Sequence, residues 1–466
     1  MKHRYDDLLR LIIRTIKNDY AGFPEKMERH DSRYYVNTTG TAFKQGKLDE
    51  LLFLRIVSQY LASLGDPNLK FSMVDHEDYR NYSVGFRVRR FADDLYVTEC
   101  AQDERLKAGD RLISVNHLPA GMHRAKFRKN ILIGNTAERE QWGGFLKMAD
   151  HFVVEHPDGT REDLPFAHFE LQQPEHRVRF WKPSSDVCCL SVEEFSQDTA
   201  ALETLLNAHE AELRICSSLV IDLRKNEGGT ESGFEPLLPL VMEHPLPRTE
   251  LPEEPVYMNY TKENCDRRVR EFQVLKNMYE KEADEGAARM CGDLIREYIE
   301  KAGSGLTREY TEKAGSGLTR EYTEKAGSGL RLESEEADFW PGAGSKEAGG
   351  CQAEPLLQPY ENIKKVILIT DTWCRDAGEV FVKMAADFSK VTVLGRPTMG
   401  TIDYTNSVTM VLDQTFVLSY PMGKRGYVMD GTRYNETGLP VDIYVPWTPR
   451  ECTEDVLLEK ALEILS

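Results

Sequence analysis

The sequence predicts an α/β core that is interrupted by a charged insert and preceded by a helical region and a small β-rich module. Near the N-terminus apolar residues recur with the period of a helix, whereas residues 82–166 form short alternating runs typical of strands. Two later blocks alternate continuous apolar strands with helices, which is the pattern of an α/β sheet. The 466 residues therefore divide into five predicted regions, namely 1–78, 79–170, 171–242, 243–360 and 361–466.

The predicted helical region, residues 1–78, contains two periodic segments. The first places five apolar side chains on one face, those of Leu8, Leu9, Ile12, Ile13 and Ile16. The second covers residues 48–64 and ends at Gly65-Asp66-Pro67, because glycine followed closely by proline stops a helix. The first segment does not have the pattern of a secretory signal, since Arg10 interrupts its apolar run and no small-residue cleavage site follows.

The next regions are a β-rich module and the first half of the core. Strands are expected near residues 84–90, 95–98, 109–116 and 152–156, and then at 187–192 and 218–223 around a helix at 199–211. The second half of the core repeats the alternation, with strands at 366–370 and 391–394 around a helix at 377–389. A split α/β core follows from this order.

The charged insert, residues 243–360, contains an internal repeat with a period of 12 residues. The copies are EYIEKAGSGLTR at 297–308, EYTEKAGSGLTR at 309–320 and a partial third at 321–330. A unit of this length is too short for a solenoid, and each Gly-Ser-Gly interrupts a helix. We expect a mobile or partly helical surface segment, with a role as a partner-binding element or lid as the alternative, followed by a flexible linker at 333–352.

Composition excludes several classes of function. The formal net charge of −18 repels polyphosphate, and no stretch reaches the length of a membrane span, so neither nucleic acid nor membrane is an expected partner. The nine cysteines form no CxxC pair and no zinc-like spacing, which favours reduced thiols in a cytoplasmic protein. No histidine spacing indicates a metal site, and we expect no cofactor.

The module carries a motif with a possible binding function. The string YSVGFRV at 82–88 is followed by LKAGDRLISVN at 106–116, and together they resemble a PDZ domain. In that family a glycine-containing loop presents N–H groups to the C-terminal carboxylate of a peptide, which then adds as a strand to the sheet edge. The resemblance implies peptide binding at Ser83, Val84, Gly85 and Phe86.

Three further stretches resemble the tail-specific, C-terminal-processing serine peptidases. They are VIDLRKNEGG at 220–229, VILITDTWCRDAGEVF at 366–381 with VTVLGRPTMG at 391–400, and NETGLPVD at 435–442. The resemblance covers nearly the whole chain outside the insert and implies a spiral core of the ClpP/crotonase type. It also implies an oxyanion hole at Gly228, Gly229 and Ala377, because glycine allows the backbone to approach a developing charge.

The residues at the family's catalytic positions differ from the family pattern. The nucleophilic serine lies three residues before a glutamate, and here that position holds Asp376 before Glu379. Processing-type members place a lysine base where this chain has Thr401, and tricorn-type members place a histidine where it has Asn68. The acid of the tricorn type falls on Asn435 or Glu436. A carboxylate at a helix N-terminus is stabilised as the anion and is a poor nucleophile toward an amide.

These substitutions favour a non-hydrolytic protein that binds peptides or protein C-terminal tails. Asp376 and Glu379 fit a capping box, which serine would fill equally well. The alternatives are an active peptidase with non-standard residues and a purely structural scaffold. An active peptidase has two candidate arrangements, Cys374 as a thiol nucleophile with His76 or His123 as base, and Lys424 as a relocated base.

Overall fold

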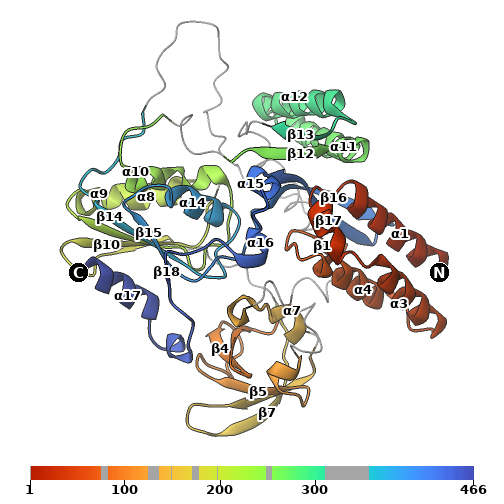
Figure 1. The fold of residues 1–466 in the computed structure, drawn as a ribbon, viewed down its shortest axis with the longest axis horizontal. Coiled ribbons are helices and arrows are strands. Elements are labelled where there is room, and N and C mark those ends of the chain that lie inside the picture. The colour runs from red at the N-terminus through yellow and green to blue at the C-terminus, as the bar shows by residue number, and fades with distance from the viewer. Residues whose placement is uncertain are drawn as a thin grey trace, which may run out of the picture.

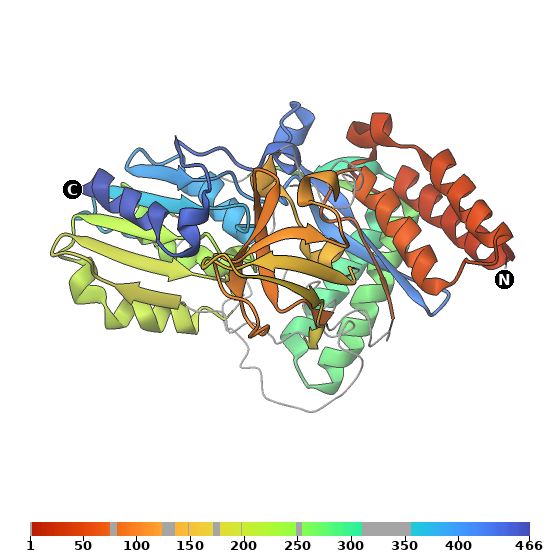
Figure 2. The same cartoon turned by 90° about the horizontal axis from the view of Figure 1, so that it is seen from below.

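The computed structural model describes residues 2–74, 82–123, 136–147, 149–170, 178–196, 198–247, 254–309 and 356–466. One mixed sheet and one antiparallel sheet form, with their helices, the upper part of the molecule in Figure 1, and a separate β module lies below them. The view from below shows the module lying across the middle of the molecule, between the C-terminal part and the N-terminal helices (Figure 2). None of the described helices combines the length and the apolar character of a membrane span.

The six-stranded sheet is the predicted α/β core, and its existence is confirmed. Its strand order is β18-β15-β14-β11-β10-β9, parallel throughout except for the edge strand β9. The strands are β9 (Val178–Trp181), β10 (Val187–Val192), β11 (Ser218–Asp222), β14 (Lys365–Thr370), β15 (Val391–Gly395) and β18 (Ile443–Tyr444).

Helices cover both faces of this sheet, which explains why its strands are apolar without alternation. The helices of this half are α8 (Ala200–Ala208), α9 (Glu210–Leu213), α10 (Leu238–Val241), α14 (Ala377–Ala385) and α17 (Val456–Leu465). Leu190 and Leu368 point into the main hydrophobic core, whereas their neighbours Cys189 and Ile367 pack with Leu457 of α17 on the opposite face.

The second sheet joins three distant parts of the chain around the long strand β17 (Phe416–Arg425). This strand pairs with β16 (Tyr404–Leu412) along its length, with β1 (Lys70–Met73) at one end and with β12 (Val256–Tyr260) at the other. The helices α1 (Lys2–Asn18), α2 (Phe23–Lys26), α3 (Ser32–Lys44) and α4 (Glu50–Ser63) precede β1. The N-terminal region was expected to be helical up to residue 78, but its last described part is the strand β1, because Phe71 and Met73 pack into the main core.

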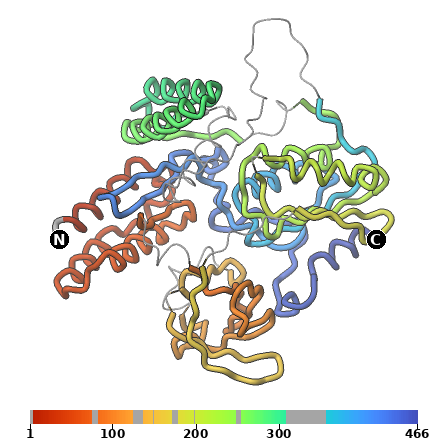
Figure 3. The backbone as a smooth tube through the Cα atoms, turned by 180° about the vertical axis from the view of Figure 1, so that it is seen from behind, coloured from red at the N-terminus to blue at the C-terminus, as the bar shows by residue number. Residues whose placement is uncertain are grey.

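The described part of the predicted insert, residues 243–247, 254–309 and 356–360, contains two helices and two strands. Helices α11 (Lys262–Lys281) and α12 (Glu285–Lys301) form a hairpin beside β12 and β13 (Gly305–Glu309), as Figures 1 and 3 show. The first repeat copy supplies the end of α12 and most of β13, with Gly303 and Gly305 at positive φ in the turn between them. Tyr298 of this copy is buried in the main core, so the expectation that all three copies lie on the surface is wrong for the first. Residues 310–330 lie outside the described residues.

The β module has its own core and an antiparallel order β3-β4-β5-β6-β7. Its elements are β2 (Tyr82–Ser83), β3 (Phe86–Phe91), β4 (Asp94–Cys100), β5 (Arg111–Val115), α7 (Gly143–Leu146), β6 (His151–Glu155), β7 (Arg161–Pro165) and β8 (Phe169–Glu170), with β2 paired to β8. The buried side chains of Leu95, Leu112 and Phe152 lie at the centre of this core.

A buried ion network fastens the module to the α/β core. Arg89 of β3 donates to both oxygens of Asp371 at 3.1 and 3.0 Å, and Arg396 donates to the same carboxylate and to Glu451. Burial alone would raise the pKa of Asp371, but the two guanidinium groups lower it below its ordinary value. The module is therefore held against the end of β14, where the candidate site begins.

Candidate functional site

The turn between β14 and α14 places Asp376 in an uncommon backbone conformation. Its φ of +54° and ψ of −124° are costly for a residue with a Cβ, and such geometry persists only where surrounding contacts hold it. The Asp376 N–H donates to Thr401 Oγ1 at 2.7 Å and, more weakly, to Glu379 Oε2 at 3.3 Å. The reach of Glu379 back to this N–H agrees with the predicted capping box.

The glycine loop after β11 lies directly against Asp376. A Cβ at Gly228 would stand 2.5 Å from the Asp376 Cβ, and one at Gly229 would stand 1.8 Å from the Phe195 carbonyl oxygen. Buried Asn226 orients the loop, because its Oδ1 accepts the Gly228 N–H and its Nδ2 donates to the Val192 carbonyl. Only glycine fits at these two positions, where φ is +94° and +128°.

The backbone N–H groups predicted for an oxyanion hole differ in whether they have a hydrogen-bond acceptor. That of Gly228 donates to Asn226 Oδ1 at 3.0 Å. Across the described residues, the N–H groups of Gly229 and Ala377 donate no hydrogen bond. Of the three predicted oxyanion-hole residues, therefore, only Gly228 has an acceptor for its N–H among the described residues.

Glu379 is the centre of the polar contacts below the turn. The fully buried carboxylate accepts hydrogen bonds from Gly400 N–H, Thr401 N–H and Thr401 Oγ1, each at 2.6 Å, and from Thr398 Oγ1. Burial raises the pKa of Glu379, and the hydrogen bonds oppose that shift. From the sequence, Glu379 is predicted only to cap α14. The run Thr398-Met399-Gly400-Thr401 after a buried strand is the one sequence signal for its contacts with that segment.

The three predicted catalytic positions lie together. Thr401 contacts Asp376 through its hydroxyl, and its carbonyl accepts a hydrogen bond from Asn68 Nδ2 at 2.7 Å. The same Asn68 amide donates to the Tyr404 carbonyl at 3.0 Å, so the side-chain NH2 group donates to two backbone carbonyl groups. Residues far apart in the sequence are thus assembled as the family resemblance implies, but their polar groups are engaged with one another.

Asn435 and Glu436 differ in environment. Asn435 is buried and donates to the Gly65 carbonyl at 2.6 Å, next to the segment that carries Asn68. Glu436 lies at the surface and pairs with Arg29 at 2.7 Å.

The groups considered as alternative nucleophile or base are held in structural contacts. Cys374 is fully buried, and burial raises the pKa of its thiol well above the ordinary value. Lys424 pairs with Glu25 at 2.7 Å and is also buried. The His123 ring lies within the β module, with Nε2 at 2.6 Å from the Val115 carbonyl. His76 lies outside the described residues.

A buried polar cluster beside Asn68 was not anticipated from the sequence. Asp403 accepts the N–H groups of Tyr434 and Asn435, and burial raises the pKa of its carboxyl to about 6. Burial lowers the pKa of Lys26, whose ammonium lies 3.9 Å from Glu436 and over the Tyr404 ring. These residues are far apart in the sequence, and charged residues such as Lys26 and Asp403 are expected at the surface. The sequence therefore gives no signal for the cluster.

The predicted carboxylate-binding loop is partly occupied by the module itself. Gly85 N–H donates to Ser83 Oγ at 3.1 Å, and a Cβ at Gly85 would stand 2.7 Å from the Phe169 ring. Val84 and Phe86 face the module core. The loop therefore leads into β3, with Phe169 lying over its glycine.

A small cavity, of about 10 Å³, lies where the module meets the turn between β14 and α14. Arg139 lines it and donates to the Met399 carbonyl at 2.6 Å, and burial lowers the pKa of this guanidinium to about 10. The group was not a sequence candidate. In the described part of the chain no group of His, Cys, Asp and Glu side chains is arranged to hold a metal ion.

Comparison with known proteins agrees with this geometry. Residues 186–445, more than half of the chain, match Peptidase family S41. No curated protein sequence matches the chain.

Among solved structures, mature CPAF complexed with lactacystin is similar, with a TM-score of 0.58 and 12% identity over 99% of this chain and 97% of that chain. Mature CPAF alone gives 0.59 and 12% identity over 99% and 96%. The photosystem II D1 C-terminal processing protease gives 0.41 and 11% identity over 97% and 98%. At these identities the CPAF structures establish likeness of fold, and the family match establishes the relationship. The chain belongs to Peptidase family S41.

Proposed function

We propose that this protein binds peptides or protein C-terminal tails and does not hydrolyse them. The observation that carries the proposal is the chemistry at the family's nucleophile position. Asp376 presents a carboxylate where the family has a serine hydroxyl, and the Gly228 loop packs against it. A carboxylate is a weak nucleophile toward an amide, and an amide substrate needs a strong one.

Among the described residues that contact Asp376 or lie at a family base position, neither Thr401 nor Asn68 replaces the missing base. Thr401 Oγ1 donates to Glu379 and accepts from the Asp376 N–H, and a neutral hydroxyl does not take up a proton at neutral pH. The Asn68 amide holds two carbonyl groups and is likewise not basic. The burial of Cys374 and the pairing of Lys424 with Glu25 weigh against the alternative of an active peptidase with non-standard residues.

The sheet edge at β3 supports tail binding. Among the described residues β3 pairs with β4 along one edge and with no strand along the other, and on our proposal an extended peptide adds to that second edge. Arg87 of this strand lies 3.3 Å from Glu227, which also pairs with Arg375 at 3.1 Å. A peptide on this edge would thus run toward Gly228 and Asp376.

The experiment measures binding of fluorescent peptides with free or amidated C-termini. Free acids should bind at least about tenfold more tightly, because loop N–H groups and nearby cations lose their anionic acceptor on amidation. Phe169→Ala should strengthen binding of the acid, since the Phe169 ring covers Gly85. Val274→Ala, which removes an exposed apolar side chain on α11 outside the β module, serves as the matched control. Equal affinity for acid and amide would overturn the proposal.

A further inference from the structure

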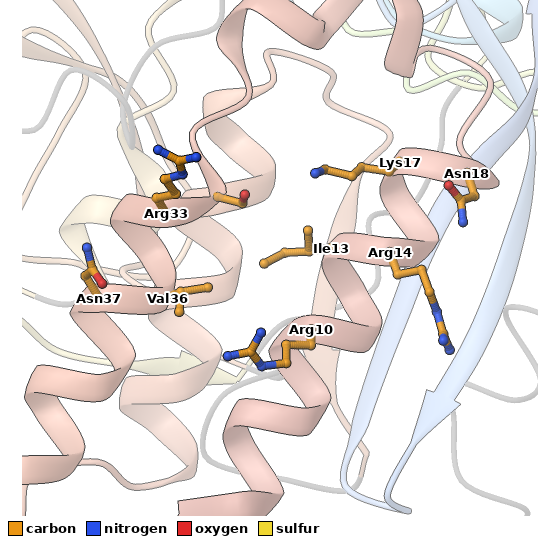
Figure 4. Close-up of a pocket in the computed structure, with 9 residues that line it drawn as sticks. Arg10, Ile13, Arg14, Lys17, Asn18, Arg33, Val36 and Asn37 are labelled. Carbon is orange, nitrogen blue, oxygen red and sulfur yellow. The ribbon is translucent and has the colours of Figure 1, made fainter.

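A concave surface lies far from Asp376 in the sequence, between helices α1 and α3. The groove has a volume of about 530 Å³, and Figure 4 shows its lining side chains. Arg10, Ile13 and Lys17 succeed one another at helical spacing and so lie on one face of α1. Arg33 and Val36 face them from α3.

The charge of this groove is opposite to that of the whole chain. Its lining contains four cationic side chains, Arg10, Arg14, Lys17 and Arg33, and no carboxylate. The chain as a whole carries 77 acidic against 59 basic residues. A lining whose charged side chains are all cationic is therefore a local feature of α1 and α3.

These cations are available to a ligand. With respect to the residues that the structure describes, Arg14, Lys17 and Arg33 form no ion pair, and all three are exposed. Arg10 has one contact, to Asp6 at 3.3 Å, between two exposed side chains, and such pairs contribute little. Elsewhere on the N-terminal helices Arg4 pairs with both Glu50 and Asp413.

The floor of the groove is apolar and fixed. Ile13 and Val36 are partly buried and pack against the main core. The opposite face of α1 is anchored in that core by Leu9, Ile12 and Ile16, all fully buried. The groove is therefore preformed, and a ligand does not have to order it.

We propose that this groove binds an acidic peptide segment in which carboxylates flank one apolar side chain. The carboxylates pair with Arg10, Lys17 and Arg33, and the apolar side chain lies over Ile13 and Val36. A short peptide stays within the roughly 8 Å over which the local charge acts at physiological ionic strength. A long polyanion or an anionic membrane extends beyond that range and meets the net charge of −18.

The test uses a short labelled peptide in which glutamates flank a single phenylalanine, acetylated and amidated so that no terminal charge contributes. Its fluorescence anisotropy is titrated with the full chain. Arg10→Glu/Arg33→Glu should weaken binding at least about tenfold, because two attractions become repulsions. Arg55→Glu/Lys47→Glu, with the same charge change on and beside α4, should leave the affinity unchanged. Raising the salt concentration should weaken binding to the wild type.

Further measurements distinguish the proposed acidic peptide from other negatively charged ligands. Replacing the glutamates by glutamine, or the phenylalanine by serine, should each reduce binding. The proposal would be overturned if either altered peptide bound as tightly as the original one. It would also be overturned if anionic vesicles bound more tightly than the peptide, or if the chain were a dimer that Arg10→Glu/Arg33→Glu converts to a monomer. If the doubly reversed variant fails to fold, Arg10→Gln/Arg33→Gln provides the same comparison with about half the charge change. This test is independent of tail binding at the β module, because the probe has no free carboxyl terminus.

Discussion

The nucleophile turn, residues 371–379 with 398–401, and the groove between α1 and α3 are both rich in charge but use it differently. In the turn the carboxylates of Asp371 and Glu379 are buried, and each accepts several hydrogen bonds. In the groove the cations are exposed, and among the described residues only Arg10 has an ion pair. The difference teaches that polar residues around the position that aligns with the family's nucleophile can be committed to holding the fold. Unpaired charge elsewhere is then a better guide to binding.

The largest effect should come from Asp371→Asn. The substitution leaves Arg89 and Arg396 buried beside a neutral amide, and breaking a buried charge pair costs about 3–5 kcal/mol. The free energy of unfolding in urea measures it. Asp387→Asn, on the exposed side just after α14, is the matched control and should change stability by less than about 0.5 kcal/mol. A loss below about 1 kcal/mol for Asp371→Asn would show that the network does not fasten the module.

Glu379→Gln should have the next largest effect and lower the free energy of unfolding by about 3 kcal/mol. The amide group of glutamine turns donors toward Thr401 or Gly400, whose N–H groups then lack an acceptor. Urea unfolding measures this loss as well. A stability equal to that of the wild type would mean that the turn holds its shape without Glu379, and the contrast with the groove would fail.

Asp403 gives the turn region a dependence on pH. Its folded pKa of about 6 is above the ordinary value of 3.8, so its contribution to stability is fully present below about pH 4 and is lost as pH rises through 6. From pH 4 to 7 the wild type should lose on the order of 2 kcal/mol relative to Asp403→Asn, which has no such titration. Parallel pH profiles of the two proteins would contradict the assignment.

The smallest effect is expected in the groove. Lys17→Ala removes an exposed cation without an ion pair among the described residues, so the free energy of unfolding should change by less than about 0.5 kcal/mol. Thermal unfolding measures this change. Destabilisation comparable to that of Glu379→Gln would show that the groove cations also hold the fold.

Much of the core could be predicted from sequence because its signals are local. Continuous apolar runs marked β10 and β14, and the order of the family signatures placed Asp376, Thr401 and Asn68 in one region. The strand β1 was missed because four residues, Lys70–Met73, carry too little alternation and depend on pairing with β17.

The features that the sequence did not predict depend on contacts between residues that are far apart in the chain. Arg89 and Asp371 are 282 positions apart, and nothing in their neighbouring residues indicates that they meet. Lys26 has the sequence context of a surface helix and is buried only because α2 packs near Tyr404. The first repeat copy has the composition of low-complexity sequence, yet its Tyr298 packs against Phe272 of α11.

The central claim is that the site keeps the arrangement of the family and lacks its chemistry. The direct measurement is cleavage of an unfolded protein substrate by the wild type, Asp376→Ser, Thr401→Lys and the double variant, each checked for folding because Thr401 also donates to Glu379. The account predicts no cleavage by the wild type or either single variant, because a serine without a base is a weak nucleophile. It predicts detectable cleavage only in the double variant, which restores a serine and a lysine base. Cleavage by the wild type that disappears in Asp376→Ala would contradict the account and make Asp376 a working catalytic group.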